Sequence, residues 1–263
     1  MNSFEQLNIH PENNLNVKTM QEKMRDPNFL PKYKEIEVYV KDANRHIEKR
    51  YKEWLDFFRG NPEKQIYEVW TEEYIEAFGN YLVQRVRDLG GSERSPIIIL
   101  EVGAGNGRLT HFLQERLERL IPGQVKIIAS DPGTSDSWKD KIDHDFPVEN
   151  LSQQEALKKY KPQIVIGSWM PYGDDFTDDF RKTSSVEEYI LIGPEHCTGN
   201  SWKTWGNPTN SEEDRELFPP YELDNFKKRR LEDLSELQIS SLVFLEIGGE
   251  KTGTYSFKRE REN

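Results

Sequence analysis

The sequence has 263 residues, a formal net charge of −11 at pH 7 and a pI near 5.1. This acidic balance works against a general affinity for DNA or RNA phosphates, so we expect no nucleic-acid partner. The single cysteine, Cys197, excludes an internal disulfide bond and a zinc site built from several cysteines.

The start of the chain and its hydropathy bear on its compartment. Residues 1–16 are polar, without the apolar stretch of a secretory signal or the arginine-rich character of a transit peptide. No apolar run in the sequence approaches the length of a membrane span. We therefore expect a cytoplasmic protein without a membrane partner, with the nucleus as the alternative compartment.

The first third of the chain, residues 1–94, is predicted to be a helical region that caps a core formed by residues 95–263. Apolar side chains recur every three or four positions across residues 31–58, a pattern typical of an amphipathic helix. A second helix is predicted from Thr71 to the glycine pair at 90–91.

Beyond Pro96 the pattern changes to an alternation of strands and helices. Helices are predicted over residues 109–120, from their apolar periodicity, and after the capping-box sequence Ser152–Glu155. The alternation indicates an α/β fold with a doubly wound, Rossmann-like parallel sheet. Four apolar runs predict strands that are buried on both faces: 97–100, 125–129, 163–168 and 189–192.

The end of the chain is predicted to close the sheet with an antiparallel hairpin. Residues 242–247 and 252–258 are strand-like, and the glycine pair at 248–249 separates them. We interpret the basic run at residues 227–230 as the solvated face of a helix rather than as a binding patch.

A glycine-rich turn directly follows the first predicted core strand, in the order Glu101-Val102-Gly103-Ala104-Gly105-Asn106-Gly107. Glycines permit a sharp turn and a close approach of a ligand to the backbone. The next strand ends at Asp131, where a carboxylate is placed to accept both hydroxyl protons of a ribose. These residues predict a nucleoside site at the carboxyl ends of the strands. The alternatives are a dinucleotide site or a turn without a ligand.

The segment from Glu101 to Gly107 resembles the first motif of the class I S-adenosylmethionine-dependent methyltransferases, an acidic residue followed by Gly-x-Gly-x-Gly. This spacing differs from the Gly-x-Gly-x-x-Gly of dinucleotide binders, which favours the methyl donor over NAD. The resemblance covers roughly residues 95–258. It implies a Rossmann-like fold, S-adenosylmethionine as cofactor and methyltransferase activity.

The resemblance also implies roles for individual residues. Glu101 would lie near the amino group of the donor, and Asp131 would bind its ribose. Glu149 or Asn150 would contact the adenine, although the strand before them is poorly marked. The remaining candidates for contact with the donor line the turn or end the third predicted strand: Gly103, Ala104, Gly105, Gly107 and Ser168.

Two loops that follow predicted strands, residues 168–176 and 193–206, are expected to form the acceptor site. Methyl transfer needs groups that align the acceptor and, where required, remove a proton. Glu195, His196 and Cys197 are too close in sequence to converge on one ion, so we predict no metal site. The candidates for the catalytic roles are aromatic, acidic or imidazole side chains: Trp169, Tyr172, Glu195 and His196.

The two loops also predict an acidic and aromatic pocket that suits a cationic amine; its side chains would be Trp169, Trp202, Trp205, Tyr172, Asp174, Asp175 and Glu195. The alternative is that the rings, including Trp202 and Trp205, fill the core beneath the first third of the chain. Either reading leaves the acceptor molecule unidentified.

Three hypotheses for the function follow. The leading one is methyl transfer to a nitrogen or oxygen of a small molecule or protein side chain. The second is a non-catalytic binding or scaffold subunit that keeps the fold. The third, a transferase that uses a decarboxylated donor and a polyamine substrate, is less favoured. The sequence makes no prediction about the oligomeric state.

Overall fold

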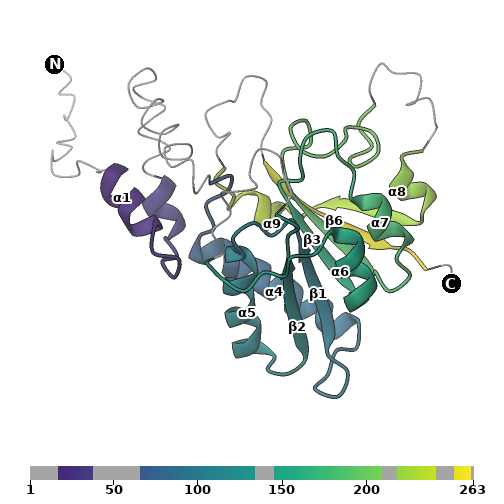
Figure 1. The fold of residues 1–263 in the computed structure, drawn as a ribbon, viewed down its shortest axis with the longest axis horizontal. Coiled ribbons are helices and arrows are strands. Elements are labelled where there is room, and N and C mark those ends of the chain that lie inside the picture. Colours follow the sequence, from purple (N-terminus) through teal and green to yellow (C-terminus); the bar gives the residue numbers. More distant parts are fainter. Residues whose placement is uncertain (1–16, 38–65, 134–144, 209–217, 241–251, 262–263) are drawn as a thin grey trace, which may run out of the picture.

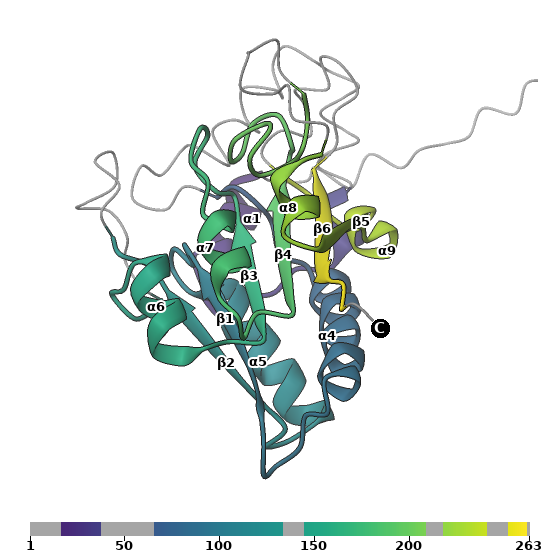
Figure 2. The ribbon, with the colours of Figure 1, turned by 90° about the vertical axis from the view of Figure 1, so that its right-hand side faces the viewer.

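The computed structural model describes residues 17–37, 66–133, 145–208, 218–240 and 252–261. Within them lies a six-stranded sheet with helices against both faces (Figures 1 and 2). The strand order is β2-β1-β3-β4-β6-β5. This arrangement confirms the predicted doubly wound α/β fold with an antiparallel end.

The four predicted core strands are present and pair in parallel. Their apolar residues are buried from both sides because successive side chains of a strand point to opposite faces of the sheet. In β1, for example, Ile99 packs on one face and Leu100 on the other. The bounds are β1 Ile97–Val102, β2 Val125–Ser130, β3 Ile164–Ser168 and β4 Glu188–Gly193.

The antiparallel end of the sheet consists of β5 (Phe226–Arg230) and β6 (Gly253–Arg259). β6 pairs with β4 on one side and with β5 on the other. The interpretation of residues 227–230 as a helix face was therefore wrong. Exposed and less exposed side chains alternate along β5, as the period of a strand requires. Residues 242–247, predicted as the hairpin partner of β6, lie outside the described residues.

Helices cover both faces of the sheet (Figure 2). On the first face, the helices α4 (Glu72–Asp88), α5 (Arg108–Leu120) and α9 (Glu232–Ser235) enclose one apolar core. On the second face, α6 (Gln153–Tyr160), α7 (Thr177–Lys182) and α8 (Pro220–Leu223) enclose another. None of the helices in the described ranges is both long and apolar enough to cross a membrane.

The helix predicted from Thr71 is α4. The Thr71 hydroxyl accepts a hydrogen bond from the backbone N–H of Tyr74 at 3.2 Å, which fixes the start of the helix. The helix predicted over residues 31–58 is described only up to residue 37, with residues 33–37 helical. A further helix, α1 (Val17–Met24), was not predicted.

The described N-terminal segment, residues 17–37, contacts the first turns of α4 and α5. Arg108, at the start of α5, donates to the backbone carbonyls of Pro27 and Phe29. Glu73 in α4 accepts from the backbone N–H of Tyr33 at 2.6 Å. These contacts agree with a segment that covers the core, while the division of the chain at residue 94 stays a prediction.

The capping box predicted from the sequence is formed at the start of α6. The Ser152 hydroxyl accepts from the Glu155 backbone N–H at 3.3 Å, and the Glu155 carboxylate accepts from the Ser152 N–H at 2.9 Å. We expect Ser152→Ala to lower the free energy of unfolding by about 1 kcal/mol, because the Glu155 N–H loses its side-chain acceptor. Chemical denaturation measures this change. Ser184→Ala, at an exposed serine after α7, serves as control and should change it by less than about 0.5 kcal/mol; equal values for both variants would contradict the prediction.

Candidate functional site

The turn after β1 uses a backbone conformation that favours glycine. Gly103, Gly105 and Gly107 have φ values of +64°, +54° and +79°. Residues with a Cβ rarely adopt this left-handed region. Gly107 is also the N-cap of α5, so the turn leads directly into the helix. The predicted strand–turn–helix arrangement is confirmed.

The three glycines differ in what surrounds them. A Cβ added at Gly103 or Gly105 would have no atom within 4 Å, so both positions border open space. A Cβ added at Gly107 would lie 2.7 Å from the Val148 side chain, which means that Gly107 is needed for packing within the protein. Gly103 and Gly105 thus form a cradle in which a ligand would lie against the backbone.

Asp131, which follows β2, faces this cradle. One carboxylate oxygen accepts from the Gly105 N–H at 2.9 Å, and the other accepts from the Gly133 N–H at 2.8 Å. Each oxygen of a carboxylate has two acceptor positions, so each keeps one for a ligand hydroxyl. The sequence predicted that Asp131 would lie near the turn, but not that its carboxylate would hold Gly105 in place.

Glu101, at the end of β1, is buried. Its Oε2 accepts from the Thr110 N–H at 3.1 Å and from the Thr110 hydroxyl, both in the first turns of α5. Burial raises the pKa of this carboxyl to about 7; the bonds from Thr110 lower it, and the negative charge of Asp131 raises it further. One oxygen of Glu101 is therefore used within the protein, and its implied role at the donor's amino group stays a prediction.

Glu149 lies beside the end of β2, but its side chain turns to α6. Its backbone carbonyl accepts from the Asp131 N–H at 2.9 Å, in a single parallel bridge to β2. Its carboxylate binds Lys159 and the Tyr160 hydroxyl, and the hydrogen bond from Lys159 lowers its pKa. Asn150 is exposed. A contact of either side chain with adenine stays a prediction.

Trp169 follows Ser168 at the end of β3 and has an unusual backbone conformation. Its φ is +54°, which is strained for a large side chain, and strained residues are enriched at functional sites. Its indole N–H donates to Glu68 Oε2 at 3.2 Å, and its ring lies 5.4 Å from that of Tyr67. The predicted acceptor-site residue Trp169 is therefore held by the segment that precedes α4. Ser168 is half-buried at the strand end.

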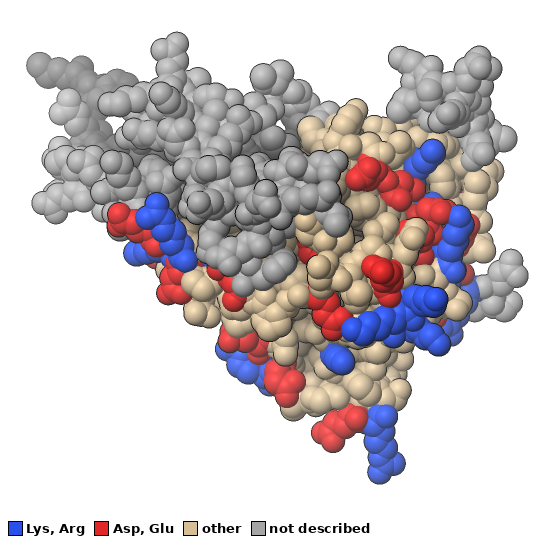
Figure 3. All heavy atoms as spheres, in the orientation of Figure 1, with Lys and Arg blue, Asp and Glu red and all other residues tan. Residues whose placement is uncertain are grey.

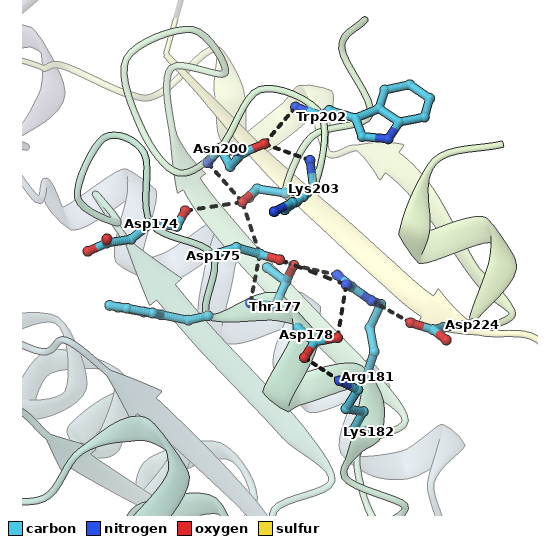
Figure 4. A network of polar contacts seen from close by, with 12 residues as sticks. Asp174, Asp175, Thr177, Asp178, Arg181, Lys182, Asn200, Trp202, Lys203 and Asp224 are labelled. Carbon is cyan, nitrogen blue, oxygen red and sulfur yellow. Dashed lines mark hydrogen bonds and ion pairs between the residues drawn. The ribbon is translucent and has the colours of Figure 1, made fainter. Parts of the chain in front are cut away.

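The loops after β3 and β4 are joined by hydrogen bonds (Figure 4). The Asp175 carboxylate accepts from the Thr177 N–H and from the Thr204 hydroxyl, both at 3.0 Å. Arg181, buried in α7, lies beside Asp175 and donates to Asp224 at 2.7 Å. The two loops predicted to form the acceptor site thus act as one unit, anchored through α7.

The predicted acidic and aromatic pocket receives no support from these contacts. Asp175 is bonded as described above, and Glu195 accepts from Lys228 at 2.6 Å. Burial raises the pKa of Glu195, but Lys228 outweighs burial and lowers it overall. Trp205 is buried, and its indole N–H donates to the Thr198 carbonyl at 2.6 Å. This placement agrees with the alternative that the ring fills the core. Acidic and basic side chains are interspersed on the face shown in Figure 3.

Of the remaining acceptor-site candidates, two are exposed and one is buried. Tyr172 is 74% exposed, and His196 is exposed beside Glu195. Trp202 is buried, like Trp205. In the part of the chain that the structure describes, no three His, Cys, Asp or Glu side chains group to hold a metal ion. Catalytic roles for Tyr172, Glu195 and His196 stay predictions.

Sequence reasoning missed Glu68, a buried carboxyl just before α4. Its Oε2 accepts from Trp169, and its Oε1 has no hydrogen-bond partner. Burial raises its pKa to about 8, while Trp169, the Ile239 backbone and Gln238 lower it. The sequence held one indication of this role. Glu68 stands between apolar and aromatic residues (Tyr67, Val69 and Trp70), whereas surface acids are mostly found within charged runs.

No protein-family model and no curated protein matches the sequence. Solved structures are similar to it at low identity. For the DszA carbon methyltransferase, the TM-score is 0.40 at 15% identity over 68% of this chain and 50% of that chain. For the CMeT domain of the citrinin polyketide synthase, the TM-score is 0.42 at 15% identity over 81% and 58%. For a SAM-dependent methyltransferase from Archaeoglobus fulgidus, it is 0.33 at 11% identity over 79% and 97%. The chain thus spans only between half and three fifths of the first two structures.

Proposed function

We propose that the chain is an S-adenosylmethionine-dependent methyltransferase. One observation carries this proposal: Gly103 and Gly105 leave open space at the carboxyl edge of a parallel sheet, opposite the Asp131 carboxylate. The carboxyl edge is where ligands bind in folds of this kind. The Gly-x-Gly-x-Gly spacing supports the methyl donor over a dinucleotide.

The residues of the cradle fit this donor. Gly103 and Gly105 would bring the backbone into contact with the nucleoside, and Asp131 would accept hydrogen bonds from its ribose hydroxyls. When bound, S-adenosylmethionine supplies a methyl group on a positively charged sulfur. The loops after β3 and β4 would then align the acceptor and exclude water.

For the acceptor, we propose a nitrogen or oxygen atom of a small molecule or protein side chain. Trp169 supports an acceptor site next to the cradle, because it directly follows the strand end that neighbours the turn and has a strained backbone. The paired state of Glu195 and Asp175 gives no preference for a cationic acceptor.

Thermal unfolding with S-adenosylhomocysteine tests the proposal. A ligand at one hundred times its dissociation constant stabilises a protein by about 2.7 kcal/mol, so the melting temperature should rise by several degrees. NAD at the same concentration is the control and should cause no increase. If NAD stabilises the protein and S-adenosylhomocysteine does not, the site binds a dinucleotide; if neither does, the proposal is refuted.

The competing proposal is a non-catalytic subunit that binds the donor without turnover. The two proposals differ in one observable: only an active methyltransferase transfers the methyl group of the donor to an acceptor. Isotopically labelled S-adenosylmethionine, incubated with the protein and fractionated extract, should yield labelled product with the unaltered protein. It should yield none with Gly105→Val, whose side chain would occupy the open space of the cradle. Binding without transfer in every fraction would favour the non-catalytic role.

A further inference from the structure

Two buried polar atoms near the end of β3 have no hydrogen-bond partner among the residues that the structure describes. They are Oε1 of Glu68, in a residue that is 7% exposed, and Nε2 of Gln238, in a residue that is 9% exposed. More than nine in ten buried polar groups in proteins are paired, so two orphans of opposite type at one place need an explanation. One is a hydrogen-bond acceptor and the other a donor.

The orphan atoms belong to one polar cluster. The Gln238 side chain lies within hydrogen-bonding range of the Glu68 carboxyl and lowers its pKa as a donor, but no bond of normal length and angle joins Gln238 Nε2 to Oε1. Gln238 uses its own Oε1 to accept from the Thr254 hydroxyl at 3.1 Å. That hydroxyl is 2.9 Å from the Tyr74 hydroxyl. The cluster therefore joins the segment before α4 to the start of β6.

The strand register places this cluster at the same edge of the sheet as the cradle, three strands along. Val102 of β1 pairs with Gly167 of β3, so the residues that follow them, Gly103 and Ser168, lie at the same level across the sheet. Ser168 pairs with Ile192, and Ile192 pairs with Thr254. Gly103 and Thr254 thus lie in one row at the carboxyl edge.

Two side chains link Glu68 to that edge. Trp169, directly after Ser168, reaches Glu68 with its indole N–H. The charges of Glu68 and Glu101 both act on the Tyr74 hydroxyl, which raises its pKa along with the larger effect of burial. Both carboxyls therefore lie near the same tyrosine.

The chemistry of the orphans matches an α-amino acid. A free amino-acid group presents an ammonium, which donates, and a carboxylate, which accepts. Glu101 already uses an oxygen to accept two hydrogen bonds from Thr110. Among the described residues, Oε1 of Glu68 is a further acidic acceptor besides the second oxygen of Glu101. Burial keeps the Glu68 pKa at about 8, and a cation placed against the carboxyl would favour its ionised form.

We propose that Glu68 and Gln238 bind the amino-acid end of the donor, with the Glu68 carboxylate on the ammonium and the Gln238 amide on the carboxylate. The assignment rests on the proposed function. It gives the segment before α4 a direct role in donor recognition and completes a site whose nucleoside end is formed by Gly105 and Asp131.

Titration calorimetry with two ligands tests the assignment. S-Adenosylhomocysteine carries the amino-acid end, whereas 5′-methylthioadenosine has the same nucleoside and thioether sulfur without it. The unaltered protein should bind S-adenosylhomocysteine more tightly. Glu68→Gln should lower the affinity for S-adenosylhomocysteine about tenfold or more, because a charge-assisted hydrogen bond is lost. It should change the affinity for 5′-methylthioadenosine by less than about twofold. Gln238→Met, which removes the amide at similar volume, should show the same selectivity.

Glu118→Gln, the same substitution at an exposed position of α5, is the matched control and should leave both affinities unchanged. Thermal unfolding of each variant establishes that it is folded. The assignment would be overturned if Glu68→Gln lowered the affinity for both ligands equally, or for neither ligand. It would also be overturned if the unaltered protein bound both ligands with equal affinity. Each of these outcomes would leave the proposed function intact. If neither ligand binds the unaltered protein, the proposed function fails and the assignment fails with it.

Discussion

Gly105→Val is expected to abolish detectable binding of S-adenosylhomocysteine, with a loss of affinity of at least about 100-fold. The Cβ at this position enters open space, so the branched side chain would occupy the room of the ligand rather than clash with the protein. The left-handed backbone at residue 105 adds roughly 1–2 kcal/mol of strain, which a folded domain tolerates. Titration calorimetry measures the affinity, and thermal unfolding shows that the variant is folded.

Gly90→Val is the matched control for backbone strain. Gly90 has a φ of +76° and likewise no atom within 4 Å of an added Cβ, but it follows α4 near the opposite end of β1. The free energy of unfolding should fall by a similar amount in both variants. Only Gly105→Val should lose its affinity for S-adenosylhomocysteine. Normal affinity in Gly105→Val would show that the cradle is not the donor site. Loss of binding in both would attribute the effect to strain.

Asp131→Ala is expected to weaken the binding of S-adenosylhomocysteine by roughly 1.5–3 kcal/mol, since a hydrogen bond to a charged group is lost. This corresponds to an affinity that is about 10- to 150-fold lower. The substitution also removes the acceptor that holds the Gly105 and Gly133 N–H groups, so the cradle loses its support from β2. Asp131→Asn keeps one acceptor oxygen and should fall between the unaltered protein and the alanine variant. Calorimetry of the three proteins gives the order.

Asp88→Ala provides the control for removal of an acidic side chain. Asp88 lies exposed at the end of α4 and forms an ion pair with Arg85 at 2.8 Å. Its loss should leave the affinity for S-adenosylhomocysteine unchanged and alter stability by no more than about 1 kcal/mol. If Asp131→Ala binds as tightly as Asp88→Ala, the ribose contact has been assigned to the wrong residue.

Local patterns of the sequence determined the core of this protein. The apolar runs that became β1 to β4 admit few alternatives, because such segments must be buried on both faces. The positive φ of Gly103 and Gly105, the approach of Asp131 to the turn and the Ser152 cap followed from short-range rules as well. In each of these cases the residues that act together are neighbours in the chain, or follow neighbouring strands.

Only the tertiary structure decided how the charged residues are used. The basic residues of β5 became a strand because β6 offers them backbone partners, whereas their side chains suit a solvated helix equally well. Glu101 turned to Thr110, Glu195 to Lys228 and Glu149 to α6. Glu68 meets Trp169 across a hundred residues of sequence. A carboxylate has no periodicity that reveals its partner, so burial and distant neighbours determine its role, and both arise only when the chain has folded.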